Sequence, residues 1–186
     1  HASSAIQSLS LAVVGSGGAG VMTAGHMLLD AAARAGFYGV MSRSSGPQIR
    51  GGEAAALLRL APTAVESHGD RFDVLLAVDW QNAHRFAAEI PIDADSLIIG
   101  DPGEGAIPEA FAAAGARVVP IPLKAIAKKI LGGRPNMVAL GVLGALAGLD
   151  IAVLGRAVEA TLQKGGEALK ASRTAMAAGV AAVAEA

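Results

Sequence analysis

The first residues that could do chemistry are glycines that end an apolar run near the N-terminus: Gly15, Gly17, Gly18 and Gly20. They lie in the stretch LAVVGSGGAG, which has the pattern Gly-x-Gly-x-x-Gly between a strand-like and a helix-like segment. Glycines allow a sharp turn and a close backbone approach to a ligand, and the free N–H groups at a helix start attract anions. The pattern predicts either a loop that binds a phosphate or another anion, or a bare turn.

A dinucleotide site needs more than these glycines. An acidic residue about twenty positions downstream normally bonds the ribose hydroxyls, yet after Asp30 the next acid is Glu53. Arg43 could instead take the 2′-phosphate of NADP, so an independent NADP-binding or other nucleotide-binding Rossmann-like protein is the alternative hypothesis. No P-loop is predicted, because no Gly-Lys-Ser or Gly-Lys-Thr follows the glycines.

A second glycine-rich stretch, SRSSGPQIRGGEAAALLRL, places Arg50 directly before two glycines. A guanidinium is planar and always charged, so it suits a carboxylate or a phosphate. The residues alone also allow a surface hairpin that carries a solvated arginine.

Two other kinds of residue are interpreted as structural. His26, His68 and His84 have no partner at metal-ligand spacing, so no metal site is predicted. Asp79 and Trp80 directly follow an apolar strand, at the sheet edge where ligands collect. We nevertheless expect Asp79 to cap the helix that follows it.

Composition limits the class of protein. The chain has 186 residues, 53% apolar and 3% aromatic, which predicts one domain with an aliphatic core. The net charge of −1 predicts no nucleic-acid or membrane-surface partner. The absence of cysteine excludes disulfides, thiolate nucleophiles and cysteine-held iron–sulfur clusters in this polypeptide, and fits a cytoplasmic protein. The most apolar window, 137–149, is shorter than the roughly twenty residues of a membrane span.

The order of apolar segments predicts an α/β fold. Strands are expected at 9–14, 37–42, 54–60, 73–78, 96–99 and 117–121, and helices at 21–35, 79–86, 108–114, 123–131, 137–149 and 151–186, the last broken near 165–166. No helix fits between the second and third strands, so these two are expected to be antiparallel. The pattern predicts a three-layer Rossmann-like domain with a mostly parallel, partly mixed sheet over 9–186. Residues 1–8 are expected to be a tag remnant or an N-terminal extension.

Four stretches carry a resemblance to a known family: GSGGAGVMTAGHMLLDAAARAG, SSGPQIRGGEAAALLRL, FDVLLAVD and PNMVALGVLGAL. Together they resemble the gamma subunit or gamma domain of 2-oxoacid:acceptor oxidoreductases, which include the pyruvate, 2-oxoglutarate, 2-oxoisovalerate and indolepyruvate enzymes. The similarity runs from about Leu9 to Leu149. The ordered pair of glycine-rich loops is more specific than either loop alone.

The resemblance implies a part in the oxidative decarboxylation of a 2-oxoacid with coenzyme A, giving acyl-CoA, carbon dioxide and reduced ferredoxin or flavodoxin. Thiamine diphosphate, magnesium and iron–sulfur clusters would belong to the alpha and beta portions, with none held by this chain alone. The chain would pack beside the thiamine site, assist access of coenzyme A and have no activity in isolation. A free subunit and a piece of a fused chain both remain open, as do a homodimer and the identity of the oxoacid.

The resemblance also assigns candidate site residues. The family's glycine turn falls on the four glycines that open this section, and its Arg-Gly-Gly motif falls on Gly46, Pro47, Gln48, Arg50, Gly51, Gly52 and Glu53. The motif is expected to face the catalytic partner. Arg50 is then the best candidate to contact a substrate carboxylate, a phosphate or an acidic group of the partner.

Three further features have two interpretations each. Lys124, Lys128 and Lys129 are expected to form a solvated helix face, with contacts to coenzyme A phosphates as the weaker interpretation. Asn136 is expected to cap the apolar helix that begins at Met137. The Gly-Asp-Pro run at 100–102 is close to a thiamine diphosphate motif, but a turn is favoured. A ligand-sensing module remains a third class of function, and the presence of both loops favours the subunit.

Overall fold

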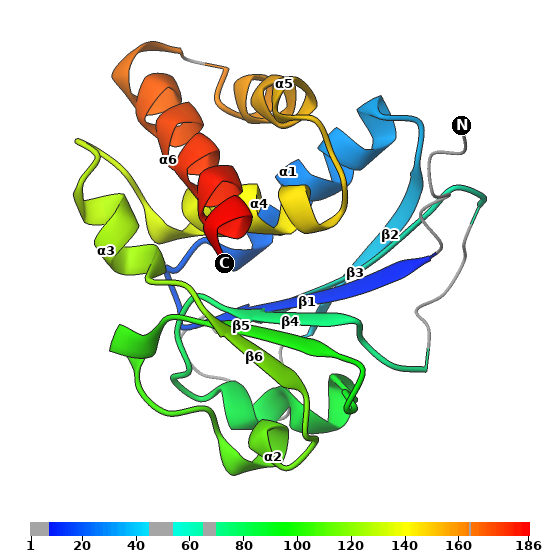
Figure 1. Ribbon diagram of the computed structural model, residues 1–186. Coiled ribbons are helices and arrows are strands. Elements are labelled where there is room, and N and C mark those ends of the chain that lie inside the picture. The colour runs from blue at the N-terminus through cyan, green and yellow to red at the C-terminus, as the bar shows by residue number, and fades with distance from the viewer. Residues whose placement is uncertain (1–7, 45–53, 65–69, 164) are drawn as a thin grey trace.

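The computed structural model describes residues 8–44, 54–64, 70–163 and 165–186. Its central layer is a six-stranded sheet in the order β2-β3-β1-β4-β5-β6 (Figure 1). The strands are β1 (Leu9–Gly15), β2 (Tyr38–Ser44), β3 (Ala54–Ala61), β4 (Val74–Ala77), β5 (Leu97–Gly100) and β6 (Arg117–Pro120).

The sheet is mixed in a simple way. Strands β1, β4, β5 and β6 pair in parallel, whereas β3 is antiparallel to both of its neighbours, β2 and β1. The expected antiparallel pairing of the second and third strands is therefore confirmed. The register of β1 with β3 runs from Leu9 opposite Leu60 to Gly15 opposite Ala54.

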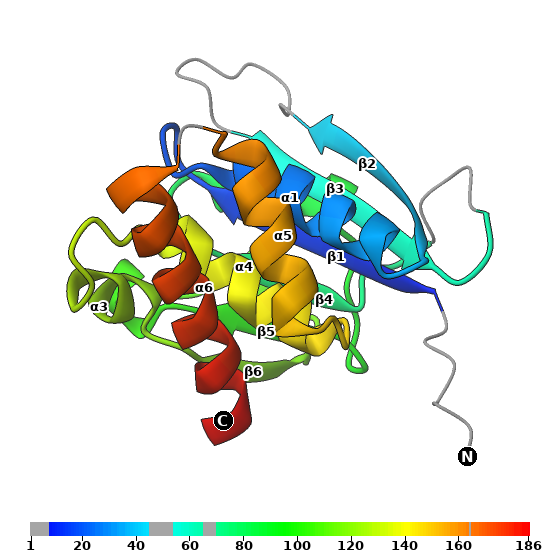
Figure 2. The same ribbon diagram turned by 90° about the horizontal axis from the view of Figure 1, so that it is seen from above.

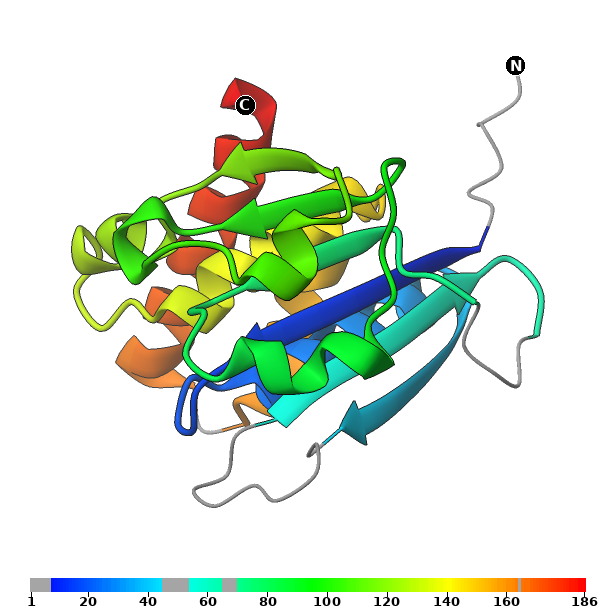
Figure 3. The ribbon, with the colours of Figure 1, turned by 90° about the horizontal axis from the view of Figure 1, so that it is seen from below.

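Helices cover both faces of the sheet, as expected for a three-layer fold. The four long helices lie over one face, as Figures 1 and 2 show. They are α1 (Val21–Arg34), α4 (Pro135–Leu146), α5 (Ile151–Thr161) and α6 (Gly166–Glu185). The opposite face is covered by short helices, visible in Figure 3. They include η1 (Ala83–Glu89) and α2 (Glu109–Ala112), whose Phe86 and Phe111 enter the core on that face. Helix η2 (Pro102–Glu104) follows β5, and α3 (Leu123–Lys128) packs instead with α4 and α6 on the face of the long helices.

The alternation of side chains along β1 creates two cores. Leu11 and Val13 pack with the long helices, while Ala12 and Val14 pack on the other face with Phe86. Successive strand residues point to opposite faces of a sheet, so a strand that is apolar at nearly every position can be buried on both sides. This explains why β1 is buried from Ser10 to its end.

Two helices begin at other residues than the sequence predicts. The helix expected at 79–86 is a 3-10 helix that begins only at Ala83, because Asn82 has a positive φ of 57°. The apolar helix begins at Pro135 rather than Met137, with proline in the first turn, where its missing N–H costs no hydrogen bond. No helix within the described ranges is long and apolar enough to cross a membrane.

Helices α4 and α6 cross at unusually short range. A Cβ on Gly141 would collide with the backbone carbonyl of Met176, and one on Gly179 would collide with that of Val138. Each glycine therefore allows the backbone of the other helix to approach. The crossing fixes α4, whose first turn reaches the glycine loop after β1.

Candidate functional site

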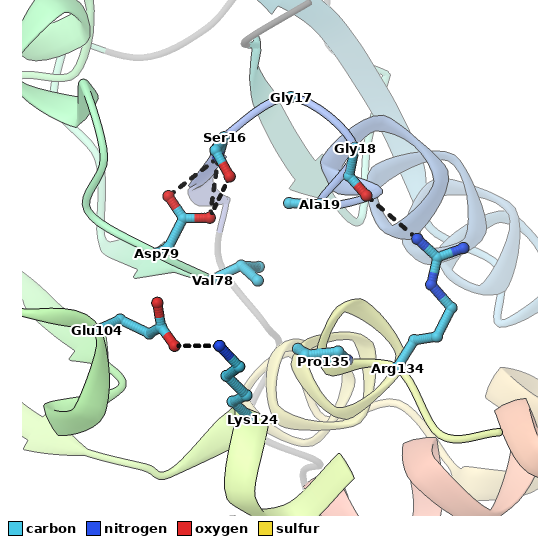
Figure 4. Close-up of a pocket in the computed structure, with 10 residues that line it drawn as sticks. All are labelled: Ser16, Gly17, Gly18, Ala19, Val78, Asp79, Glu104, Lys124, Arg134 and Pro135. Carbon is cyan, nitrogen blue, oxygen red and sulfur yellow. Dashed lines mark hydrogen bonds and ion pairs between the residues drawn. The ribbon is translucent and has the colours of Figure 1, made fainter. Parts of the chain in front are cut away.

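The main candidate site lies between β1 and β4, at the point where the chain changes the direction in which it adds strands to the sheet. After β1 the chain passes by way of α1 to β2 on one side, whereas after β4 it continues to β5 on the other. Ligands of open α/β sheets bind at the carboxyl ends of strands at such a switch point. A pocket of about 240 Å³ is found there (Figure 4). Its lining residues are Ser16, Gly17, Gly18, Ala19, Val78, Asp79, Glu104, Lys124, Arg134 and Pro135.

The predicted glycine loop forms one side of this pocket. Gly17 and Gly18 line it, whereas Gly15 and Gly20 shape the turn on either side. Gly18 and Gly20 have φ values of 82° and 74°, a left-handed conformation that side chains disfavour. Within the described residues, the N–H groups of Gly17 and Gly18 donate no hydrogen bond. The loop therefore offers free donors to an anion.

Asp79 holds the start of the loop and does not cap a helix. Its carboxylate accepts hydrogen bonds from the Ser16 N–H at 3.0 and 3.1 Å and from the Ser16 hydroxyl at 2.7 Å. It also accepts from the N–H of Gln81 at 3.1 Å, while the cap position of η1 is Asn82. The expectation of a helix cap is wrong, because the adjacent pairing of β1 and β4 brings Asp79 to Ser16 instead.

The first residues of α4 hold the other end of the loop. The Arg134 guanidinium donates to the carbonyl of Gly18, and the Asn136 amide donates to the carbonyl of Gly20, both at 3.2 Å. Asn136 is only 4% exposed, and its Oδ1 has no partner among the described residues. The expectation that Asn136 caps the apolar helix is wrong: the cap position is Arg134, and no side chain caps it.

The charges around the pocket leave cationic donors available. Asp79 already accepts from the loop, and Glu104 lies 3.4 Å from the ammonium of Lys124. Arg134 has five N–H donors and uses one contact, to Gly18, within the described chain. Figure 4 shows these groups around the same pocket. The arrangement can bind a small anion through Arg134, Lys124 and the backbone N–H groups.

The three lysines expected on one solvated helix face differ in their relation to the pocket. Lys124 lines the pocket, whereas Lys128 and Lys129 are exposed and lie outside it. The buried Asp101 accepts from the N–H of Gly103 at 2.8 Å and from that of Lys124 at 2.9 Å. Both oxygens of Asp101 therefore accept hydrogen bonds from backbone N–H groups. The Gly-Asp-Pro run is thus a structural turn, as predicted.

Among the described residues, the arginine considered for the dinucleotide alternative is poorly placed to contact the ribose phosphate. Arg43 lies on β2, and β3 separates that strand from β1. Because neighbouring strands are about 4.8 Å apart, the end of β2 lies about 10 Å from β1 rather than directly beside it. The arginine proposed for a 2′-phosphate is therefore displaced from the place that a dinucleotide fold would give it.

Several predicted residues cannot be placed. Gly46, Pro47, Gln48, Arg50, Gly51, Gly52, Glu53 and His68 lie outside the described residues. The strand that follows the Arg-Gly-Gly motif begins with Ala54, which pairs with Gly15 at the base of the glycine loop.

His26 on α1 and His84 on η1 are both exposed. Within the part of the chain that the structure describes, no three His, Asp or Glu side chains come together as a metal centre would require.

The sequence does not single out three of the polar residues that line the pocket, and it predicts the wrong role for two residues that hold the glycine loop. Ser16, Glu104 and Arg134 were not candidates, while Asp79 and Asn136 were assigned to caps. One signal was present for Asp79, since it directly follows a buried strand at the ligand-binding edge. Arg134 had no comparable local signal, because its partner Gly18 is 116 residues away.

A family model described as pyruvate ferredoxin/flavodoxin oxidoreductase matches residues 10–182. The 2-oxoglutarate:ferredoxin oxidoreductase from Magnetococcus marinus, solved with 2-oxoglutarate, coenzyme A and succinyl-CoA bound, is similar with a TM-score of 0.81 and 27% identity. The match covers 97% of this chain and 32% of that one, so this chain spans about a third of that relative's length.

Two smaller proteins have the same fold over nearly their whole length. The gamma subunit of a keto/oxoacid ferredoxin oxidoreductase from Geobacter sulfurreducens matches with a TM-score of 0.73 and 24% identity, covering 96% of this chain and 99% of that one. The pyruvate oxidoreductase subunit PORC from Thermotoga maritima matches with a TM-score of 0.71 and 18% identity, over 95% and 97%. A comparison with curated proteins finds no significant match.

Proposed function

Because this chain belongs to the pyruvate ferredoxin/flavodoxin oxidoreductase family, we propose that it is the gamma component of a 2-oxoacid:ferredoxin or flavodoxin oxidoreductase. It acts as a free subunit or as the gamma portion of a longer chain. The complete complex carries out the thiamine-diphosphate-dependent oxidative decarboxylation of a 2-oxoacid to acyl-CoA and carbon dioxide. The chain has no activity alone and works with alpha and beta portions, in the cytoplasm.

The redox and thiamine chemistry is assigned to those other portions. The chain has no cysteine to hold an iron–sulfur cluster. Asp101, in the one run close to a thiamine motif, has both oxygens bonded to backbone N–H groups. The residues present therefore do not fit either cofactor, and both would have to be held by the other portions.

The pocket at the switch point is the observation that carries the proposal, and we assign it to a phosphate group of coenzyme A. Two free N–H groups of the glycine loop and the spare donors of Arg134 supply the hydrogen bonds. Lys124 is 56% exposed, and its ion pair with Glu104 is weak for that reason. Lys124 can therefore exchange Glu104 for a phosphate. The chain binds and orients the coenzyme while the thiol reacts in the partner's site.

Arg50 has a separate role in this proposal, which rests on the sequence motif alone. Its guanidinium contacts the substrate carboxylate, a phosphate or an acidic group of the catalytic partner. In the active complex, Arg50→Ala is expected to raise a KM or lower kcat. Unchanged kinetics would remove Arg50 from the site.

The subunit role is tested by co-expression with the neighbouring reading frames. The purified complex is assayed for coenzyme A-dependent dye reduction with pyruvate, 2-oxoglutarate and indolepyruvate as substrates. Activity is expected only when this chain and a thiamine-binding partner are both present. Failure to co-purify with such a partner would refute the subunit role.

The pocket assignment is tested in the same complex. Arg134→Ala and Lys124→Ala should each raise the KM for coenzyme A about tenfold or more, since hydrogen bonds to charged groups contribute about 1.5–3 kcal/mol. The KM for the oxoacid should not change. Lys170→Ala, at an exposed lysine of α6 outside the pocket, is the matched control. An unchanged KM for coenzyme A in both pocket variants would contradict the assignment.

A further inference from the structure

Glu104 lines the pocket at the switch point, although the ligand proposed for that pocket is an anion. Its Oε1 lies 3.4 Å from the ammonium of Lys124, and Figure 4 shows the two side chains pointing toward each other. The Glu104 side chain is only 24% exposed, so most of it is covered by protein, whereas the Lys124 side chain is 56% exposed. A carboxylate of the chain itself therefore occupies a cationic group that a phosphate oxygen would use.

One buried residue positions both members of this ion pair. Asp101 is 3% exposed, and its Oδ2 accepts a hydrogen bond from the N–H of Lys124 at 2.9 Å. The backbone carbonyl of Asp101 accepts from the N–H of Glu104 at 3.0 Å, and its Oδ1 accepts from the N–H of Gly103 at 2.8 Å. The end of η2 and the start of α3 are thus bonded to the same residue. The fold itself therefore directs Glu104 toward Lys124.

The other charged groups of the pocket are engaged differently. Both carboxylate oxygens of Asp79 accept hydrogen bonds from Ser16, and Arg134 donates to the neutral carbonyl of Gly18. Among the described residues that line the pocket, Lys124 is the cation that is paired with an acid. The lining carries two carboxylates and two cations, so its formal charge is zero.

An anion that enters this pocket meets Glu104 in two ways. It must displace the carboxylate from Lys124, which costs little because the ion pair is exposed on the lysine side. It must also lie near a negative charge, and the Coulomb repulsion grows in proportion to the charge of the anion. Both effects lower the affinity of the pocket. The repulsion lowers it more for a doubly charged anion than for a singly charged one.

We propose that Glu104 is an internal competitor for the phosphate of the ligand, which limits the affinity of the pocket and selects against highly charged anions. The inference rests on the proposed function, because the ligand is the coenzyme A phosphate assigned to this pocket. Coenzyme A and its acyl-CoA product carry the same phosphates, so a pocket that held them too tightly would also delay release of the product. Competition by Glu104 keeps the binding of both weak enough for exchange.

The test follows the backbone N–H signals of Gly17 and Gly18 by nuclear magnetic resonance while an anion is added to the full chain. Sulfate is the doubly charged probe, and dimethyl phosphate is the singly charged one. Glu104→Gln keeps the shape of the side chain and removes its charge, so it should strengthen sulfate binding about three- to tenfold and dimethyl phosphate binding by less. The matched control is Glu109→Gln, which removes the same charge at an exposed position of α2 outside the pocket. The control should leave both affinities unchanged.

A double variant separates competition from simple repulsion. Repulsion by Glu104 acts whether or not Lys124 is present, whereas competition requires Lys124. The gain in sulfate affinity from Glu104→Gln should therefore be about two- to fivefold larger in the original chain than in the Lys124→Ala background, the range of an exposed ion pair. An equal gain in both backgrounds would overturn the competition.

The outcomes also separate this inference from the proposed function. If neither probe shifts the Gly17 and Gly18 signals in the original chain or in Glu104→Gln, the pocket binds no anion, and the coenzyme assignment fails together with the competitor. If sulfate binds the original chain and Glu104→Gln binds it no more tightly than Glu109→Gln does, the competitor alone is refuted. The subunit role is decided separately, by co-purification with a thiamine-binding partner.

Discussion

The two left-handed glycines of the loop provide a sharp test of how the site is held. Gly18 and Gly20 have nearly the same φ, 82° and 74°, so an alanine at either position meets the same backbone strain. Their surroundings differ. A Cβ on Gly18 would find no atom within 4 Å, whereas one on Gly20 would collide with the side-chain amide of Asn136. The pair therefore separates backbone strain from steric overlap.

The expected magnitudes follow from these two contributions. Gly18→Ala should cost about 1–2 kcal/mol of unfolding free energy, the cost of the left-handed conformation for a residue with a Cβ. Gly20→Ala should carry the same cost plus about 1–3 kcal/mol of overpacking against a buried side chain. The total for Gly20→Ala is then about 2–5 kcal/mol.

The measurement is urea unfolding followed by circular dichroism, with the midpoint and slope fitted for each variant. Adding Asn136→Ala to Gly20→Ala removes the obstacle, so the double variant should be more stable than the sum of the single changes predicts, by about 1–3 kcal/mol. Equal costs for Gly18→Ala and Gly20→Ala would refute the steric argument. Strict additivity in the double variant would refute the direct contact.

Two further predictions concern stability away from the site. Gly141→Ala should lower the melting temperature, because its Cβ would meet the Met176 carbonyl and overpacking costs about 1–3 kcal/mol. Gly155→Ala should raise the melting temperature, because the nearest atom to its Cβ would be Nε of Arg173 at 3.7 Å and helical Ala is more stable than Gly by roughly 0.5–1 kcal/mol. Similar effects at both positions would contradict the close helix crossing. The hydrogen bond from Arg71 lowers the pKa of Asp93 in the folded state. The ionised Asp93 therefore stabilises the folded state at pH values above its unfolded pKa of about 3.9, and this stabilisation is lost as the pH falls and the carboxylate is protonated. The melting-temperature difference between the original chain and Asp93→Asn should therefore be larger at neutral pH than in acid, and a difference independent of pH would exclude this cause.

Most of the scaffold could be predicted because its signals are local. The apolar run before the glycines predicts β1, and the helical pattern after Gly20 predicts α1. The lack of room for a helix between the second and third strands predicts their antiparallel pairing, which the structure confirms. The glycine loop and its place at a strand end could also be identified, since backbone conformation and residue type are coupled at such turns.

What holds the loop was decided by the tertiary structure alone. Asp79 is 63 residues from Ser16, and Arg134 and Asn136 are each 116 residues from the carbonyls that they contact. Sequence reasoning assigned a cap to Asp79 and to Asn136, because a polar residue beside an apolar helix is usually explained by its nearest backbone. The pairing of β1 with β4 and the crossing of α4 with α6 place these side chains against the loop instead. Sheet order and helix packing depend on how the whole chain buries its apolar faces, and that information is not contained in any single stretch.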